Sequence, residues 1–323
     1  MIRILPLLFL IYFFTSCNIG TSSELNSVPE AELSPTPNIP KPLDAKPDAE
    51  LQKRFAQIAA EAKGKVGVYA MLIETGDAAG LNSTQHFPMQ SVYKLPISMA
   101  VMQQIEAGKL NLDDKVGVGN NDFVRPGQAS AIRDKYPNGT ELSVKELIQY
   151  AISESDGTAS DVLMNLAGGA PKAQLYLTSI DIKDINIANS EKEMGRDWQV
   201  QYDNWATPEA AVSLLMKMRD WSKWRPGADE PEELLTKFMA ESTPGAKRLK
   251  GLLPAKTVVA HKTGTSGSRD GITAATNDIG VIALPNGKHV AIAVFVSDSP
   301  TDGKTREGVI AKIAKAAYDK WSR

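Results

Sequence analysis

Ser91 and Lys94 are the first pair whose types and spacing suggest chemistry, in the segment Ser91-Val92-Tyr93-Lys94. Apolar residues continue after the lysine, so the segment is predicted to open a helix with both side chains on one face. A lysine amine placed there can accept the proton of the serine hydroxyl, and the helix N-terminus adds a positive dipole end and free N–H groups. The pair favours a serine nucleophile, although a serine helix cap beside a surface lysine would give the same pattern.

A second polar group follows at Ser155-Asp156-Gly157, between two segments with helical periodicity. A helix cap would explain it, because either Ser155 or Asp156 can accept hydrogen bonds from the first backbone N–H groups of a helix. The alternative is a second hydroxyl that serves the same site as Ser91. The group alone does not decide between these interpretations.

The third group is Lys262-Thr263-Gly264-Thr265, at the end of a predicted strand. A cation, a hydroxyl and backbone N–H groups at a strand edge can bind an extended substrate. The alternative is a polar strand end that runs into a glycine turn.

The order of the three groups, SxxK, then SDx, then KTG, is the signature of class A β-lactamases and penicillin-binding proteins. From about Leu51 to the C-terminus the chain resembles a class A serine β-lactamase, and it is most similar to the PER and VEB subgroup. The stretches that carry this resemblance beyond the motifs are 189–194 (NSEKEM), 201–208 (QYDNWATP), 248–251 (RLKG) and 274–278 (AATND).

The resemblance implies that Ser91 is the acylated nucleophile, Lys94 its proton partner and Ser155 the proton shuttle to the leaving β-lactam nitrogen. Backbone N–H groups of Ser91 and Thr265 would form the oxyanion hole. Arg248 resembles the arginine that helps to bind the substrate carboxylate, for which a guanidinium fork is suited. The residues that the resemblance assigns to substrate binding are Lys262, Thr263, Gly264, Thr265, Arg248 and Gly157.

Glu191 resembles the Ω-loop glutamate that activates the deacylating water. This glutamate separates the hydrolases from penicillin-binding proteins, which stay acylated. Whether it or Lys94 is the acylation base is disputed for the family. The alternative is a solvated loop carboxylate, because Glu193 and other charged residues are close in the sequence.

Two residues depart from the family pattern. Gly157 stands where most members have an asparagine, whose amide contacts Lys94 and the acylamino carbonyl of the substrate. Its absence removes hydrogen bonds worth about 1 kcal/mol each. Gly195 stands where the family has asparagine, or histidine in the PER and VEB subgroup, to help hold the water. We therefore expect slow hydrolysis, or hydrolysis that depends on Glu191 alone.

The PER and VEB resemblance favours cephalosporins as substrates and a role in antibiotic resistance. Because the chain has one cysteine, the disulfide of the serine carbapenemases is excluded, which argues against efficient carbapenem hydrolysis. Two other functions stay open. One is a D,D-peptidase or penicillin-binding protein, which shares the three motifs but against which Glu191 argues. The other is a covalent β-lactam receptor without turnover, which Gly157 and Gly195 make conceivable.

The elements that must position these residues come from both ends of the chain. At the two ends we expect a helix and a strand at 48–63 and 65–74, then strands at 257–262, 278–284 and 289–296 and a helix at 307–321. Between them the apolar periodicity predicts helices at 91–107, 143–152, 158–166 and 208–218. This order indicates an α/β (α+β) fold of the β-lactamase/transpeptidase-like type. An antiparallel sheet from both chain ends is flanked by helices and carries an inserted all-helical domain, with the site in the cleft.

The N-terminus indicates export. Arg3 precedes an apolar run, 4–14, that is too short to span a bilayer, and Phe14-Thr15-Ser16-Cys17 resembles a bacterial lipobox. We expect Cys17 to be lipidated, the alternative being an ordinary signal peptide with an incidental cysteine. The protein would then be a lipoprotein on the periplasmic side of the inner or outer membrane. The expected parts are a signal peptide (1–17), a disordered tether (18–47), an α/β domain (48–88 and 250–323) and a helical domain (89–249) with an Ω-like loop at about 188–207.

Composition excludes several classes of function. The single cysteine and three dispersed histidines, His86, His261 and His289, exclude a thiolate cluster and argue against zinc. A formal net charge of −2 without a Lys/Arg run argues against nucleic acid. We expect no metal and no other cofactor, β-lactams as the small-molecule partners, and a monomer, as is usual in the family.

Overall fold

The computed structural model describes residues 45–218 and 233–323, which lie in one compact unit, Ile39–Arg323. The expected signal peptide with Cys17, and the expected tether up to residue 44, lie outside the described residues. At the end of that expected tether, Lys46–Pro47 form a short strand, β1. No helix of the described residues combines the length and the apolar character needed to cross a membrane.

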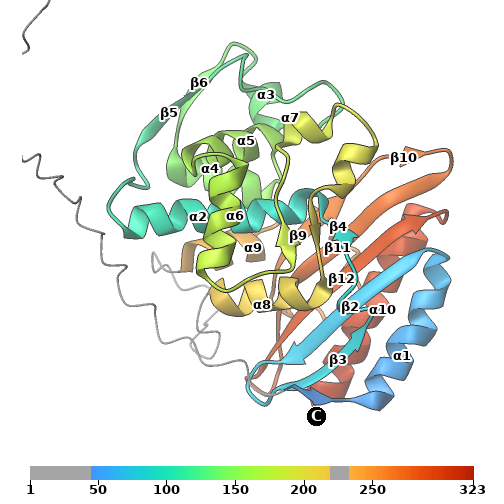
Figure 1. Cartoon of the computed structure of the whole chain (residues 1–323). Coiled ribbons are helices and arrows are strands. Elements are labelled where there is room, and N and C mark those ends of the chain that lie inside the picture. The colour runs from blue at the N-terminus through green and yellow to red at the C-terminus, as the bar shows by residue number, and fades with distance from the viewer. Residues whose placement is uncertain (1–44, 219–232) are drawn as a thin grey trace, which may run out of the picture. The chain divides into compact units, whose positions relative to one another are not determined.

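A sheet built from both ends of the chain runs through the described part (Figure 1). Its order is β1-β3-β2-β12-β11-β10, and β9 pairs with β11. The long neighbours are antiparallel, whereas β1 runs parallel to β3. The other strands are β2 (Lys65–Leu72), β3 (Asp77–Leu81), β9 (Val259–Thr265), β10 (Ser268–Arg269), β11 (Ile272–Ala283) and β12 (His289–Ser299).

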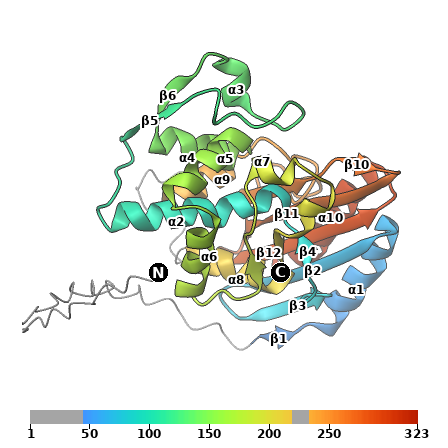
Figure 2. The same cartoon turned by 45° about the horizontal axis from the view of Figure 1, so that its top comes forward.

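Successive side chains of a strand point to opposite faces of the sheet. In this sheet each face packs in a core of its own. On β12, Ile292 and Val294 pack in a core with the helices α1 (Ala49–Ala59) and α10 (Gly303–Trp321). Ala293 and Phe295 belong to a second core, shared with the helices of the middle of the chain. Figures 1 and 2 show α1 and α10 side by side on one face and the other helices beyond the opposite face.

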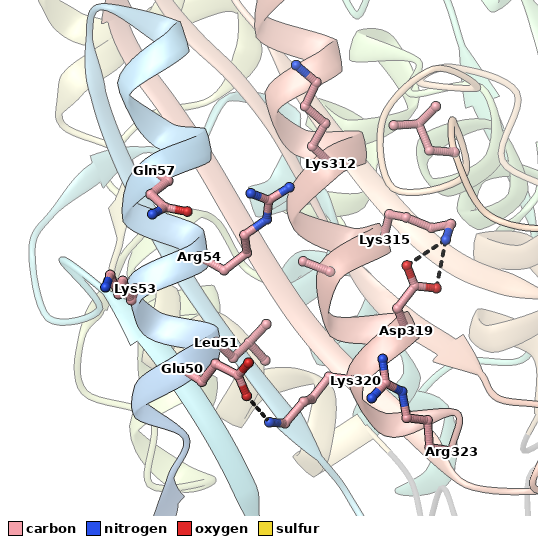
Figure 3. Close-up of a pocket in the computed structure, with 12 residues that line it drawn as sticks. Glu50, Leu51, Lys53, Arg54, Gln57, Lys312, Lys315, Asp319, Lys320 and Arg323 are labelled. Carbon is pink, nitrogen blue, oxygen red and sulfur yellow. Dashed lines mark hydrogen bonds and ion pairs between the residues drawn. The ribbon is translucent and has the colours of Figure 1, made fainter.

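The helices α1 and α10 are joined by ion pairs at the surface. Lys320 Nζ lies 2.7 Å from Glu50 Oε2, and Lys312 Nζ lies 2.5 Å from Glu61 Oε2 in the 3-10 turn η1 (Ala60–Ala62). A shallow pocket of about 500 Å³ opens on the outer side of the two helices (Figure 3). Its walls are mostly charged, and none of its lining residues belongs to the expected active site.

The middle of the chain forms the helical part. Its helices are α2 (Lys94–Glu106), α3 (Ala131–Lys135), α4 (Val144–Ser153), α5 (Gly157–Leu166), α6 (Ala170–Ser179), α7 (Glu191–Met194), α8 (Pro208–Met218) and α9 (Leu234–Ala240). Shorter pieces are the 3-10 turns η2 (Gln90–Tyr93) and η3 (Gln199–Tyr202) and the strands β4 (Phe87–Pro88), β5 (Lys115–Val118), β6 (Thr140–Ser143), β7 (Ile185–Asn186) and β8 (Trp205–Ala206).

The expected fold class is confirmed, and most expected elements lie within a few residues of their predicted limits. One difference is β11, which begins at Ile272 rather than at 278. The segment 272–277 has no apolar alternation because the strand is buried on both faces there, so periodicity could not detect it. The division of this unit into an α/β and a helical domain stays a prediction.

Candidate active site

Ser91 lies in the turn η2, directly before α2 begins at Lys94. The preceding residue, Gln90, has a left-handed backbone (φ 49°), which turns the chain from β4 into the helix. Asn277 of β11 holds this entry in place, because its Nδ2 donates to the carbonyl oxygens of Pro88 at 2.8 Å and Met89 at 3.1 Å. The expected helix start is confirmed, although its first turn is a 3-10 turn.

Strand β9 passes directly beside this turn. A Cβ atom at Gly264 would lie 2.2 Å from the carbonyl oxygen of Met89, so a side chain at this position would push the strand away. The glycine of the KTG group therefore allows β9, which carries Lys262 and Thr265, to lie against the nucleophile turn.

Ser155 and Asp156 point in different directions. Ser155 has a left-handed backbone (φ 59°), its carbonyl accepts from Lys94 Nζ at 2.7 Å, and its Oγ accepts from Lys262 Nζ at 2.8 Å. Asp156 is the N-cap of α5, and its carboxylate accepts from the N–H groups of Ala159 and, across to α3, Ile132. The helix cap is therefore Asp156, whereas Ser155 contacts Lys94 and Lys262.

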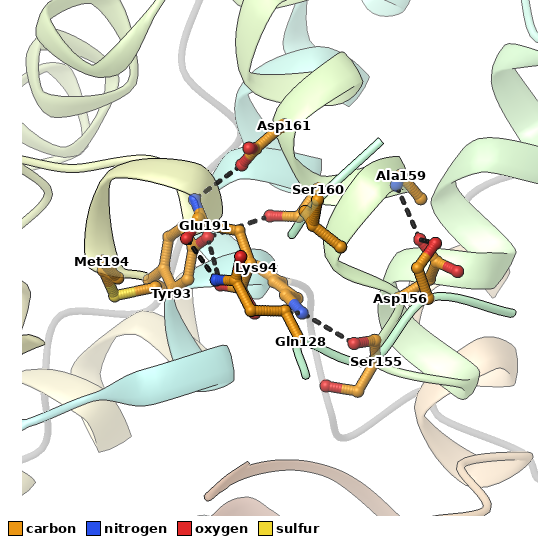
Figure 4. Close-up of polar contacts among 12 residues, drawn as sticks. Tyr93, Lys94, Gln128, Ser155, Asp156, Ala159, Ser160, Asp161, Glu191 and Met194 are labelled. Atoms are coloured by element: carbon orange, nitrogen blue, oxygen red, sulfur yellow. Dashed lines mark hydrogen bonds and ion pairs between the residues drawn. The ribbon is translucent and has the colours of Figure 1, made fainter. Parts of the chain in front are cut away.

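Glu191 meets the lysine of the SxxK group (Figure 4). Its Oε1 lies 3.2 Å from Lys94 Nζ, and its Oε2 accepts from the Tyr93 hydroxyl at 2.8 Å. Lys94 is buried, and the Glu191 side chain is only 13% exposed. Glu191 is therefore not a solvated loop carboxylate. The neighbouring Glu193 instead closes a capping box with Ser190 at the start of α7.

Lys262 is completely buried at the other side of Ser155. Burial, and after it the charge of nearby Lys94, hold the pKa of Lys262 well below its ordinary value. Its Nζ donates to Ser155 Oγ and to the carbonyl oxygen of Thr263 at 3.2 Å. Lys94, Ser155 and Lys262 thus form a continuous polar path next to the nucleophile turn.

Hydrogen bonds from the start of the short helix α7 to a side chain of α5 fix α7 in place. Asp161 accepts from the backbone N–H of Glu191 at 2.7 Å and of Lys192 at 3.1 Å. Burial raises the pKa of Asp161 to about 6, against the lowering effect of these two donors. Asn204 closes the base of the Ω-like loop, with Oδ1 accepting from Ala188 and Asn189 N–H groups.

Residues 50–321 match the family described as the Beta-lactamase enzyme family. The chain belongs to this family. Beta-lactamase VEB-1 of Pseudomonas aeruginosa is 41% identical over 255 residues, which is 79% of this chain and 85% of that relative. Extended-spectrum beta-lactamase PER-1 of the same species is 39% identical over 268 residues, 83% of this chain and 86% of that relative.

Solved structures agree with this assignment. A beta-lactamase from Chitinophaga pinensis DSM 2588 superposes with a TM-score of 0.79 at 42% identity, covering 84% of this chain and 99% of that chain. TLA-1 extended-spectrum beta-lactamase gives a TM-score of 0.79 at 41% identity, covering 85% and 99%. The protein is therefore a serine β-lactamase of class A, and the resemblance to the PER and VEB subgroup is confirmed.

In this β-lactamase the two glycines that depart from the family pattern lie next to Glu191 and α7. A Cβ atom at Gly157 would lie 2.9 Å from Glu191 Cγ and 3.1 Å from the carbonyl oxygen of Ala129. A Cβ atom at Gly195 would lie 2.9 Å from the side-chain amide of Gln128. The Gln128 amide occupies the space beside Gly195 and donates to the carbonyl oxygen of Glu191.

Arg248 is buried against β9. Its guanidinium donates to the Thr265 hydroxyl at 2.7 Å, to the Gly264 carbonyl at 3.1 Å and to the Asn277 carbonyl at 2.8 Å, and Nε pairs with Glu307 at 3.3 Å. The structure thus places Arg248 at the Thr265 end of the strand. Thr263 is buried in β9, opposite Asp278 of β11.

The sequence patterns do not indicate four residues of the site: Tyr93, Gln128, Ser160 and Asp161. Tyr93 lies inside the SxxK group itself, and its hydroxyl is the one available signal. The other three come from a loop and from α5, and nothing in their spacing indicates contact with Glu191. Among the described residues, no three His, Cys, Asp or Glu side chains are arranged to hold a metal ion.

Proposed function

We propose that this β-lactamase opens its substrate through a covalent acyl-enzyme on Ser91. The observation that supports this most directly is the polar path beside Ser91, in which Lys94 meets Glu191 at 3.2 Å and Lys262 meets Ser155 Oγ at 2.8 Å. One end of the path can accept a proton and the other end can deliver one.

In acylation, Ser91 Oγ attacks the β-lactam carbonyl carbon and its proton passes to the Lys94 amine. The amide C–N bond breaks, and Ser155 supplies a proton to the ring nitrogen. N–H groups of Ser91 and Thr265 stabilise the negative charge on the carbonyl oxygen. The substrate carboxylate binds near Lys262, Thr263 and Arg248.

Substrate binding and the charge of Lys262 are linked in this proposal. Burial and Lys94 lower the pKa of Lys262 in the free enzyme. An anionic substrate group favours the charged ammonium form, so it offsets part of that effect when it binds. Arg248 adds a permanent positive charge at the far end of β9.

In deacylation, Glu191 removes a proton from a water molecule, whose oxygen attacks the ester carbonyl. The ester bond to Ser91 breaks and Ser91 Oγ regains a proton. This step completes the hydrolysis and distinguishes the enzyme from a penicillin-binding protein or a covalent receptor.

Intact-mass measurement during turnover of a chromogenic cephalosporin tests both assignments. Glu191→Gln should accumulate one equivalent of acyl adduct on Ser91 and lose turnover by at least about 100-fold. Glu193→Gln is the matched control, since glutamine also closes a capping box, and it should turn over like the wild type. Turnover by Glu191→Gln at the wild-type rate would refute the deacylation assignment, and adduct formation by Ser91→Ala would refute the nucleophile.

We also propose a preference for cephalosporins, including extended ones, and a role in antibiotic resistance. The support is the likeness to VEB-1 and to the extended-spectrum enzyme PER-1. Values of kcat/KM for penicillins or carbapenems well above those for cephalosporins would contradict the preference.

We propose that the protein is lipidated at Cys17 and periplasmic, which the Phe14-Thr15-Ser16-Cys17 pattern supports. We also propose that it is a monomer, as is usual in the family. Cys17→Ser should move the enzyme of a producing cell from the membrane fraction to the soluble fraction without changing its kcat. A variant that stays in the membrane fraction would contradict the anchor.

A further inference from the structure

Tyr93 occupies a position between the nucleophile and the lysine from which its hydroxyl reaches Glu191. The ring is completely buried, and the hydroxyl donates to Glu191 Oε2 at 2.8 Å (Figure 4). The Ser160 hydroxyl of α5 donates to the Tyr93 oxygen at 3.3 Å. A phenol has one proton, so a donor on its oxygen leaves that proton directed at the carboxylate.

The two oxygens of Glu191 therefore have different partners. Lys94 of α2 donates to Oε1 and Tyr93 of η2 donates to Oε2. The other charged groups that face the carboxylate are Asp161 of α5 and Lys262 of β9. Burial, and then the charge of Glu191, raise the pKa of Tyr93 well above its ordinary value, so the phenol keeps its proton.

Gly157 leaves the space that this arrangement needs. A Cβ atom there would lie 2.9 Å from Glu191 Cγ, and it could not move away because it would also lie 3.1 Å from Ala129 O and from Val124 Cγ1. A side chain at position 157 would therefore require Glu191 or the surrounding atoms to shift from the positions seen here. The position of the carboxylate thus depends on an absent side chain at 157 and on a hydroxyl at 93.

We propose that the Tyr93 hydroxyl, oriented by Ser160, is a positioning group that fixes the Glu191 carboxylate for deacylation. This inference rests on the proposed role of Glu191. Glu191 takes one proton from the water whose oxygen attacks the ester carbonyl, the bond to Ser91 Oγ breaks, and Ser91 regains a proton. Tyr93 neither gains nor loses a proton in this step. Its hydroxyl holds one carboxylate oxygen, Oε2, and thereby fixes the orientation of the Glu191 carboxylate.

The direct test is Tyr93→Phe, which removes one oxygen atom and leaves the buried ring. The deacylation rate constant, measured after rapid acylation, should fall by about 10- to 100-fold, the effect of losing one hydrogen bond to a charged group. The acylation rate constant should stay within about twofold of the wild type. Because deacylation then limits turnover, kcat and KM should fall together while kcat/KM stays constant, and intact mass should show accumulated acyl-enzyme.

Two further variants define the contact. Ser160→Ala keeps the phenol but removes its orienting donor, so it should slow deacylation less than Tyr93→Phe does. Tyr176→Phe is the control, because Tyr176 is a partly buried tyrosine on α6 outside the site, and it should leave both rate constants unchanged.

The outcomes separate this inference from the proposed function. Wild-type deacylation by Tyr93→Phe, together with a trapped adduct in Glu191→Gln, overturns the positioning role and leaves the role of Glu191 intact. Wild-type turnover by Glu191→Gln overturns the role of Glu191 itself. Equal losses of acylation and deacylation in Tyr93→Phe also overturn the proposal, because they indicate a general structural effect.

Discussion

Polar residues that are close in the sequence have different roles in this site. Ser155 faces Lys262, whereas Asp156 beside it caps α5. Glu191 faces Lys94, whereas Glu193 two positions later caps α7. The role of each residue depends on where its side chain points, which the local backbone sets. The left-handed φ of Ser155 turns its carbonyl toward Lys94 and leaves Asp156 at the start of α5.

At the residue scale, Asp161 should impose a pH dependence on stability. Its pKa in the folded protein is about 6, above the ordinary value of 3.8, so the folded state binds more protons than the unfolded state between these values. The free energy of unfolding should therefore fall as pH rises from about 4 to 6, by at most about 3 kcal/mol. Urea unfolding of the wild type and of Asp161→Asn across this range measures it, since the variant lacks this titration.

Asp302 serves as the control for that experiment, because its effect on the free energy of unfolding changes with pH in the opposite direction. Hydrogen bonds from Thr305 lower the pKa of Asp302, the exposed N-cap of α10. Its stabilising effect is present above its ordinary pKa and is lost as pH falls, and Asp302→Asn should remove it. A wild-type curve parallel to that of Asp161→Asn from pH 4 to 7 would contradict the raised pKa of Asp161.

At the scale of elements, close approach of backbones assembles the site. Strand β9 can lie against the nucleophile turn because Gly264 has no side chain, and Asn277 of β11 ties the same turn to the sheet. On the other side, Gln90 Nε2 donates to Gln201 Oε1 at 2.7 Å and links the turn to the Ω-like loop. The nucleophile is thus fixed from two sides by elements that are distant in sequence.

Gly264→Ala should consequently separate β9 from the turn. The added methyl group would meet the backbone oxygen of Met89 at 2.2 Å, an overlap that costs about 1–3 kcal/mol or more and that displaces Lys262. The melting temperature and the acylation rate constant should both be lower than in the wild type. Gly267→Ala, just past the end of the same strand with no atom within 4 Å, is the control and should behave like the wild type. Equal behaviour of the two variants would disprove the close-approach argument.

At the scale of the whole described unit, the two ends of the chain share one core. Helices α1 and α10 pack on the same face of the sheet, and their apolar side chains, with those of β2 and β12, form a continuous cluster. Ion pairs such as Lys312–Glu61 lie at the rim of this contact. Buried apolar area, rather than surface charge, should therefore hold the ends together.

Two adjacent residues of α10 allow the contributions of buried apolar area and of surface charge to be compared. Ile313→Ala should lower the free energy of unfolding by about 2–5 kcal/mol, because Ile313 is completely buried and the change leaves a cavity. Lys312→Ala should cost less than about 1 kcal/mol, since its side chain is 46% exposed. Urea unfolding of both variants measures the difference, and a larger loss for Lys312→Ala would contradict the argument.

Motif order and apolar periodicity are local properties of the chain, and they were sufficient to predict the family, the fold class and the principal elements. The motifs and the resemblance also indicate Ser91, Lys94, Ser155, Glu191 and Lys262, all of which the structure places in or beside one polar path. Only the tertiary structure showed that Tyr93, Ser160, Asp161 and Gln128 support Glu191. It also showed that Gly157 and Gly195 leave space that other groups use. These contacts join segments tens of residues apart, and which side chains meet depends on how the helices and the sheet pack together.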